Sequence, residues 1–280
     1  MGPVVHRRCG KNLQGNTVTE NAMPWQKTAI IGTGLLGGSI GLAMKNLGYT
    51  NEILGLGRTQ STLELAAELG CVDTISTDLQ NACDAGLVII ATPVGTINPI
   101  LDQLAKHLRQ IQPKLHPIIT DVGSTKTSIV AHGCTVLPDA TRFVGSHPMA
   151  GREEHGPSAA RDDLFRNRPV VICAHPKTDP QVQTTVTQFW EALGMRAIEQ
   201  SPEYHDRTVA FVSHLPHILA GLLVDVVDGQ GVLDRASTGF ADTTRVASGD
   251  GQIWVDILLD NREAILEALE QFARAPDNLK

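Results

Sequence analysis

The feature that most constrains the fold is a set of three glycines spaced as G-x-G-x-x-G, namely Gly32, Gly34 and Gly37. An apolar, strand-like run over 28–31 precedes them, and a helix-like run over 39–47 follows. The first glycine of such a turn permits a tight bend, the second lets a pyrophosphate approach the backbone, and the third lets the helix pack on the strand. The helix N-terminus then directs free N–H groups at the phosphates. The turn residues expected to contact a dinucleotide are Gly32, Gly34, Leu35, Leu36 and Gly37.

The chain continues to residue 199 as an alternation of short apolar runs and amphipathic runs. The apolar runs predict strands over 28–31, 52–56, 87–91, 117–122, 170–173 and 195–198. The amphipathic runs predict helices over 39–47, 61–69, 97–108, 125–132 and 180–193. The stretch 143–156 is dense in polar residues and glycines, and it indicates a loop. This succession predicts an α/β fold with a doubly wound, Rossmann-type parallel sheet and a site at the carboxyl ends of its strands.

After Glu199 the strand signal ends and the remaining chain is predicted to be helical. Ser201 and Pro202 form a good helix start, the apolar run that follows should kink at Pro216, and 253–272 is a final amphipathic helix. About 80 residues of helix carry more apolar surface than they can cover alone, so we expect an all-helical dimerisation domain and a homodimer. The predicted organisation is a polar extension over 1–26, a dinucleotide-binding domain over 27–199 and a helical domain over 200–280.

The composition narrows the class of protein. The formal net charge of −7 over 280 residues argues against binding to nucleic acids or to an anionic membrane surface. We find no apolar run that approaches the roughly 20 residues of a membrane span. The five cysteines are scattered, without a C-x-x-C pair, and predict reduced thiols in a cytoplasmic protein, with neither a disulfide framework nor a zinc site.

The end of the second predicted strand bears on the choice of cofactor. An NAD-binding turn usually has an acidic residue here to hold the ribose 2′-OH, but the position falls on Gly57. Arg58 and Thr59 follow, and a guanidinium with a hydroxyl suits a 2′-phosphate, so the sequence favours NADP over NAD. Arg58 is otherwise a solvated surface arginine. Thr92 and Pro93, at the end of the third predicted strand, are also expected beside the cofactor.

The chain carries five motifs in one order. They are Gly32-x-Gly34-Leu35-Leu36-Gly37-Gly38-Ser39, Asp121-Val122-Gly123-Ser124-Thr125-Lys126, Gly145-Ser146-His147-Pro148-Met149-Ala150-Gly151, Ser213-His214-Leu215-Pro216-His217 and Gly239-Phe240-Ala241-Asp242-Thr243-Thr244-Arg245. In this set the chain resembles the prephenate and arogenate dehydrogenases of tyrosine biosynthesis, over nearly the whole length after Thr28. The first motif is shared by many dehydrogenases, whereas the third and fourth are much more specific. The N-terminal extension departs from the family pattern, and the chain end soon after Phe272 implies a smaller dimer interface.

The resemblance implies an oxidative decarboxylation, with hydride transfer to a nicotinamide, of a small-molecule substrate, a cyclohexadiene with a ring hydroxyl and a ring carboxylate. Arogenate gives tyrosine in this reaction, and prephenate gives 4-hydroxyphenylpyruvate. The two substrates differ only in an amino or a keto group, and no single residue decides between them. Because NADP use is expected, arogenate is slightly favoured over prephenate as the substrate.

The resemblance also assigns roles in the chemistry to residues of the dinucleotide-binding half. It makes His147 the general base, because neutral imidazole suits the removal of a hydroxyl proton, and an unshifted histidine titrates at about pH 6–7. It gives Ser124 a hydrogen bond to the substrate hydroxyl or to His147. Ser124 is also a candidate N-cap of a helix that begins at Thr125. Lys126 either helps to neutralise the substrate or is a surface lysine of the first helical turn.

In the helical half, the resemblance puts His214 in the substrate pocket and Arg245 at the ring carboxylate, where a bidentate guanidinium is the expected partner. The active site should therefore lie between the two domains. His214 and His217 are three residues apart, a spacing that suits a metal, but no third ligand is evident and we expect no metal. The role of His217 stays open. The Arg-Glu-Glu-His run over 152–155 indicates a solvated loop.

Two other functions fit part of the sequence. A β-hydroxyacid dehydrogenase also joins a dinucleotide domain to a helical one, but it usually relies on a lysine in the helical part. The helical half of this chain has no lysine before Lys280. A non-catalytic NADP-sensing regulator needs the glycine turn and no base, so His147 and Arg245 in matching motifs argue against it.

Overall fold

The structure is a computed structural model. It describes residues 25–49, 52–112, 116–152 and 154–275. The extension predicted over 1–26 therefore lies outside the described residues, apart from Trp25 and Gln26. Trp25 is only 6% exposed and packs edge-on against Phe189, with ring centroids 6.1 Å apart. The indole of Trp25 thus belongs to the core rather than to a polar extension.

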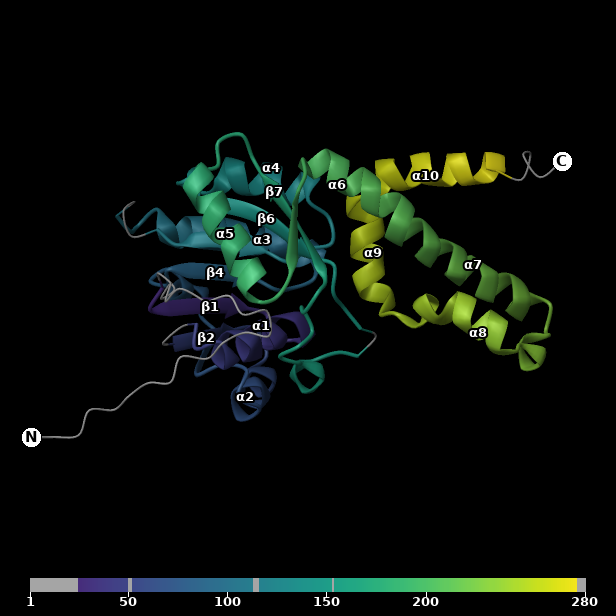
Figure 1. The fold of residues 1–280 in the computed structure, drawn as a ribbon, viewed down its shortest axis with the longest axis horizontal. Helices are drawn as coiled ribbons and strands as arrows, with labels where there is room; N and C mark the ends of the chain where they lie inside the picture. Colours follow the sequence, from purple (N-terminus) through teal and green to yellow (C-terminus); the bar gives the residue numbers. More distant parts are fainter. Residues whose placement is uncertain (1–24, 50–51, 113–115, 153, 276–280) are drawn as a thin grey trace, which may run out of the picture.

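An eight-stranded sheet forms the first half of the molecule (Figure 1). Its strands are β1 (Lys27–Ile31), β2 (Glu52–Leu56), β3 (Thr74–Ser76), β4 (Leu87–Ile90), β5 (Ile118–Asp121), β6 (Phe143–Pro148), β7 (Pro169–Ala174) and β8 (Arg196–Glu199). They lie in the order β3-β2-β1-β4-β5-β6-β7-β8, and every neighbouring pair is parallel except β6–β7. The predicted Rossmann-type fold is confirmed, whereas the antiparallel β6–β7 pair was not predicted.

Five helices cover the two faces of this sheet. They are α1 (Leu35–Asn46), α2 (Gln60–Glu68), α3 (Val94–Leu108), α4 (Thr127–Val136) and α5 (Pro180–Ala192). The core under α3 and α4 contains Val88 and Ile90, and the core under α1, α2 and α5 contains Leu87 and Ile89. Successive residues of β4 therefore point to opposite faces, and all four are fully buried. A strand covered on both faces needs a continuous apolar run, which is why the sequence located these strands.

Strand β6 lies where the sequence predicted a loop, because Gly145, Ser146 and Pro148 are residue types that strands disfavour. Ser146 is nevertheless fully buried. Its hydroxyl lies 2.8 Å from Thr120 Oγ1 and accepts a hydrogen bond from Trp190 Nε1 at 3.0 Å. These partners come from other elements of the fold. They satisfy the hydrogen bonds of the Ser146 hydroxyl, which a surface loop would have exposed to water.

Smaller differences arise at the ends of elements. Strand β3 has three residues, Thr74 to Ser76, which are too few and too polar to give a strand signal. Helix α1 begins at Leu35 rather than Ser39, because its glycines conceal the helical pattern. Helix α4 begins at Thr127 rather than Thr125. None of these shifts changes the order of the elements.

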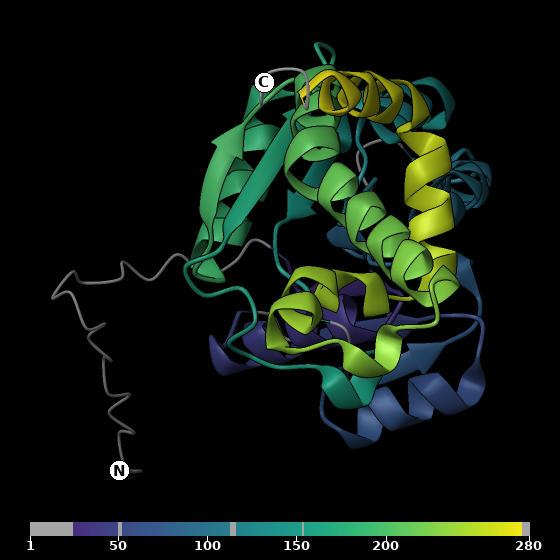
Figure 2. The same cartoon turned by 90° about the vertical axis from the view of Figure 1, so that its right-hand side faces the viewer.

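The second half of the chain is helical in the described residues. It contains α6 (Pro202–Val209), a π-helical turn (Ala210–His214), α7 (Leu215–Gly229), α8 (Thr238–Thr244), α9 (Gly251–Asp260) and α10 (Arg262–Arg274). The interruption expected at Pro216 takes the form of the π turn just before it, and the predicted final helix over 253–272 is divided at Asn261. Helices α7 and α8 contact each other and extend away from the sheet as an arm (Figures 1 and 2).

One helical run, Pro202–Gly229, is 28 residues long with a mean hydropathy of 1.7, which suffices to span a membrane by length and composition. The prediction from the sequence that no apolar run approaches the length of a membrane span is therefore wrong. Only 28% of its most apolar window is buried in the single chain. The run also includes the buried polar residues His205 and Asp206, which bond to the sheet half. Its apolar surface therefore belongs to a helix that docks on the sheet and leaves one face uncovered.

The glycine turn makes a prediction about stability. A Cβ at Gly37 would fall 1.9 Å from the carbonyl oxygen of Gly32, whereas a Cβ at Gly34 meets no atom within 4 Å. Overpacking costs up to about 3 kcal/mol, and alanine gains only about 1 kcal/mol over glycine in a helix. We expect Gly37→Ala to lower the free energy of unfolding by about 2 kcal/mol in denaturant titrations without ligand. Gly34→Ala is the control, with a change within about 0.5 kcal/mol. Equal stability of the two variants would contradict the packing role of Gly37.

Candidate active site

A cleft of about 660 Å³ opens at the carboxyl ends of β1, β2 and β4. Strand β1 lies between β2 and β4, so the connections leave it in opposite directions and a crevice forms at this edge of the sheet. Six of the nine predicted cofactor residues line the cleft: Gly32, Gly34, Arg58, Thr59, Thr92 and Pro93. Leu35, Leu36 and Gly37 lie behind it in α1, where Leu36 packs on the core.

The cleft fits an anionic dinucleotide in three respects. The N-termini of α1 and α2 have no side-chain cap and no acidic residue in their first turns, so their free N–H groups are open to phosphate. Among the described residues, the buried hydroxyl of Thr92 lacks a hydrogen-bond partner. Arg58 is the one charged residue among those that line the cleft in the described chain. Bound, the dinucleotide would pair with Arg58 and with both helix ends.

A buried ion pair supports the turn that follows β5. Lys126 is 0% exposed, and its Nζ contacts Asp121 Oδ2. Asp121 Oδ2 also accepts a hydrogen bond from the Gly123 N–H at 2.7 Å. Burial raises the pKa of Asp121, and the ammonium of Lys126 opposes that rise. The interpretation of Lys126 as a surface lysine is therefore wrong, and its expected contact with substrate finds no support here, because the ammonium is committed to Asp121.

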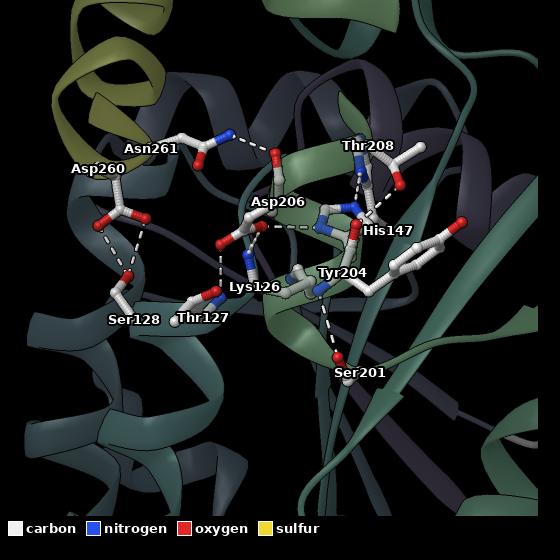
Figure 3. A network of polar contacts seen from close by, with 12 residues as sticks. Lys126, Thr127, Ser128, His147, Ser201, Tyr204, Asp206, Thr208, Asp260 and Asn261 are labelled. Carbon is white, nitrogen blue, oxygen red and sulfur yellow. Dashed lines mark hydrogen bonds and ion pairs between the residues drawn. The ribbon is translucent and has the colours of Figure 1, made fainter. Parts of the chain in front are cut away.

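The first turn of α4 receives its cap from the helical half of the chain (Figure 3). Asp206 of α6 accepts hydrogen bonds from the Lys126 N–H at 2.7 Å and the Thr127 N–H at 2.8 Å. Burial raises the pKa of Asp206, but bonds from His205 and Thr127 outweigh it and hold the pKa below its ordinary value. The hypothesis that Ser124 caps this helix is wrong. Ser124 lies partly exposed at the turn between β5 and α4.

The ring of His147 projects from β6 rather than from a loop and is partly exposed. Its Nδ1 lies 2.8 Å from Nε2 of His205 in α6, and the ring centroids are 5.1 Å apart. Burial lowers the pKa of His147 well below its usual range, and repulsion by His205 and His214 in their protonated forms, and by Lys126, lowers it further. The expectation of an unshifted histidine is therefore wrong, and His147 is neutral near pH 7.

His214, at the end of the π turn, is almost completely buried. Asn261 Nδ2 donates to the backbone carbonyl of Asp206 at 2.8 Å and lies 3.1 Å from His214 Nδ1. A carbonyl oxygen only accepts, so the amide nitrogen faces it, His214 Nδ1 accepts, and the proton of His214 sits on Nε2. Burial lowers the pKa of His214 to about 4, so this ring is also neutral near pH 7.

The remaining predicted residues lie farther along the helical half. His217 stacks on Trp254 with centroids 3.4 Å apart, and burial lowers its pKa. Arg245 is exposed at the start of the turn Arg245–Ser248, which packs beside α7. No group of three or more metal-binding side chains lies together in the described part of the chain. The run 152–155 is exposed where described, with an Arg152–Glu154 ion pair at 2.8 Å.

Sequence reasoning did not identify four polar residues that hold the site together: Asp121, His205, Asp206 and Asn261. Asp121 was quoted within a motif without a role, and Asn261 falls in the middle of a predicted helix. The adjacent pair His205-Asp206 gave a weak signal, because two polar residues lie near the start of a long apolar run. His147, the partner of His205, lies 58 residues earlier in the chain, and Lys126, a partner of Asp206, lies 80 residues earlier. No local sequence pattern connects such distant residues.

Comparisons with known proteins agree with this arrangement. The sequence model described as "Prephenate dehydrogenase, nucleotide-binding domain" matches residues 40–199, and that described as "Prephenate dehydrogenase, dimerization domain" matches residues 201–280. The prephenate dehydrogenase of Bacillus subtilis (strain 168) is 36% identical over 257 residues, which cover 90% of this chain and 68% of that protein.

Two crystal structures extend the comparison to the fold. The prephenate dehydrogenase of Aquifex aeolicus, in complex with hydroxyphenyl propionate and NAD+, has a TM-score of 0.86 at 30% identity, covering 92% of this chain and 91% of that one. The Synechocystis arogenate dehydrogenase has a TM-score of 0.76 at 31% identity, covering 90% of each chain. Two domain matches that together span residues 40–280, with relatives at this level of identity, show that the chain belongs to the prephenate dehydrogenase family.

Proposed function

We propose that the protein is an NADP-dependent dehydrogenase that oxidatively decarboxylates arogenate or prephenate. The observation that carries the proposal is the position of His147, a neutral imidazole near the carboxyl end of β6. The dinucleotide cleft opens at the same edge of the sheet, beyond β1 and β4. The structural relatives support it, since one is named an arogenate dehydrogenase and another was crystallised with hydroxyphenyl propionate and NAD+.

The chain's own residues supply binding and proton transfer. The nicotinamide, when bound, accepts the hydride from the hydroxyl-bearing ring carbon. His147 removes the hydroxyl proton as that hydride leaves. Arg245 holds the ring carboxylate, which departs as carbon dioxide while its bonding electrons complete the aromatic ring, and the protonated His147 returns its proton to the resulting phenolate oxygen. Ser124 hydrogen-bonds the substrate hydroxyl or His147, and His214 lines the substrate pocket with its Nε2–H as a donor.

A steady-state assay of four combinations, arogenate or prephenate with NADP+ or NAD+, tests this function directly. We expect turnover with NADP+ and a modest preference for arogenate. Absence of turnover in all four combinations would exclude the proposed reaction and favour a cofactor-sensing role.

The cofactor preference rests on Gly57, Arg58 and the uncapped N-terminus of α2. A Cβ at Gly57 makes only an ordinary contact with Leu63, 3.4 Å away, so an aspartate fits there. We expect Gly57→Asp to raise KM for NADP+ and lower KM for NAD+, because a carboxylate repels the 2′-phosphate and binds the ribose hydroxyls. The matched variant Arg58→Ala should raise KM for NADP+ by roughly 10- to 150-fold, for a charged hydrogen bond of about 1.5–3 kcal/mol, without changing KM for NAD+. Equal efficiency of the parent with both cofactors would refute this preference.

Removal of the base and of the carboxylate partner should change different kinetic constants. In His147→Asn we expect kcat to fall by about 10²- to 10⁴-fold with little change in KM, because general-base catalysis is lost. In Arg245→Gln we expect KM for the substrate to rise by roughly 10- to 150-fold, more than kcat falls. Near-parental kcat in His147→Asn would show that another group is the base.

The pH profile gives the base assignment a second readout. The neutral ring is the active form, and a lowered pKa keeps His147 neutral to a lower pH. The acid limb of kcat/KM should therefore lie well below about pH 6.5, the ordinary histidine value, and should vanish in His147→Asn. An acid limb at or above that value would assign it to a different group.

We also propose that the helical domain, which we take to begin near residue 200, joins two copies of the chain. Large apolar side chains are exposed along α7, α9 and α10: Leu222, Leu223, Val226, Val255, Leu259, Leu266 and Phe272. Large apolar side chains exposed in this number are typical of an interface between subunits. The name of the matching family domain, a dimerization domain, supports the assignment.

Sedimentation equilibrium at micromolar concentration should show a dimer of this 30.0 kDa chain. Val226, on α7, is 64% exposed, and we expect Val226→Glu to weaken association because it buries a charge in the interface. Leu47 lies on the sheet domain and is 50% exposed, so Leu47→Glu is the control that leaves the dimer intact. A monomeric parent would overturn the proposal.

A further inference from the structure

The carboxylate of Asp206 has three N–H groups directed at it. The backbone N–H groups of Lys126 and Thr127 donate to Oδ1 and Oδ2, and His205 Nδ1 lies 2.7 Å from Oδ1. An ionised carboxylate only accepts hydrogen bonds. The hydrogen bonds that it receives lower the pKa of Asp206, so the ionised form prevails near neutral pH. The His205–Asp206 contact is therefore made by a proton on Nδ1 of His205.

The state of His205 determines the state of His147. When His205 carries a single proton, on Nδ1, it presents the lone pair of Nε2 to His147 Nδ1 at 2.8 Å. His147 must then carry its own proton on Nδ1, and its lone pair is left on Nε2. This is the one described hydrogen bond of the His147 ring, so Nε2 stays available to a ligand. We propose that His205, held by Asp206, is a positioning residue that fixes His147 in the tautomer with a basic Nε2.

The inference rests on the proposed function for its consequence, because a fixed tautomer matters only if His147 is the base. It adds a chain of hydrogen bonds that links residues of three different elements. His147 belongs to β6, His205 and Asp206 to α6, and the N–H groups that fix Asp206 to the first turn of α4. The helical half therefore holds the base in its reactive form through the same carboxylate that caps a helix of the sheet half. If α6 moved away from α4, His147 would lose both its acceptor and its tautomer.

Two substitutions at His205 separate this role from simple packing. A glutamine amide reaches as far as the imidazole Nε2, so His205→Gln retains an acceptor for the Nδ1–H of His147. An asparagine amide ends near the position of Nδ1, so His205→Asn retains the contact with Asp206 and leaves His147 Nδ1 without an acceptor. His132, whose Nε2 lies 3.0 Å from Asp102 on the protein surface, provides the control variant His132→Asn.

The kinetic result expected is a difference between the two amides. His205→Asn should lower kcat by about 10²- to 10⁴-fold, as when an imidazole base loses its tautomer partner, with KM for substrate and cofactor nearly unchanged. His205→Gln should recover at least about tenfold of that loss. His132→Asn should match the parent. Equal losses in the two His205 variants, in proportion to a fall in Tm, would assign His205 a structural role and overturn the proposal.

A spectroscopic readout needs no substrate. Long-range ¹H–¹⁵N spectra of ¹⁵N-histidine-labelled protein at pH 8 distinguish Nδ1–H from Nε2–H rings. We expect His147 as the Nδ1–H tautomer in the parent and in His205→Gln, and a shift towards Nε2–H in His205→Asn. An Nε2–H ring of His147 in the parent would overturn the inference even if the enzyme turns over. The expected tautomer together with no turnover of either substrate would instead refute the proposed function alone.

Discussion

The carboxylate of Asp206 is the interaction on which the arrangement of the two halves depends. A buried carboxylate costs several kcal/mol unless its oxygens receive hydrogen bonds. Asp206 receives three, two from the first turn of α4 and one from His205, and charge-assisted bonds contribute about 1.5–3 kcal/mol each. The positive end of the α4 dipole adds to this stabilisation. Helix α4 has no side-chain cap from its own N-cap residue, and Asp206, about 80 positions later in the chain, caps its N-terminus instead.

Two further carboxylates of the helical half lie at first turns of helices of the sheet half, one at α4 again and one at α3. Asp260 accepts from the Ser128 hydroxyl at 2.7 Å in the first turn of α4. The carboxylate of Asp256 lies against Gly95 in the first turn of α3, where a Cβ would fall 2.7 Å from Oδ2. Negative side chains from α6 and α9 thus meet the positive ends of α3 and α4. This charge pattern fixes how the helical half docks on the sheet.

The same docking gives His147, one of the two site histidines, its hydrogen-bond partner. His147 of the sheet half gains its partner, His205, only when the halves meet, whereas His214 and its partner Asn261 both belong to the helical half. Burial lowers the pKa of both rings, so they remain neutral near pH 7. The hydrogen bonds then give them opposite roles, because His147 presents a lone pair on Nε2 and His214 presents an N–H. One neutral acceptor and one neutral donor suit the transfer of a hydroxyl proton without an added charge.

The sequence by itself determined the elements whose signal is local. The glycine turn, the strands buried on both faces and the helical second half were all predicted, because backbone geometry and continuous burial leave short-range patterns. Tertiary structure alone decided that 143–148 is a strand, that Lys126 is buried, and that Asp206 rather than Ser124 caps α4. Ser146 in β6 and the first turn of α4 have polar partners far along the chain, and buried Lys126 pairs with Asp121, five residues away. A polar side chain has the same identity whether it meets water or a buried partner, and only the folded chain brings that partner to it.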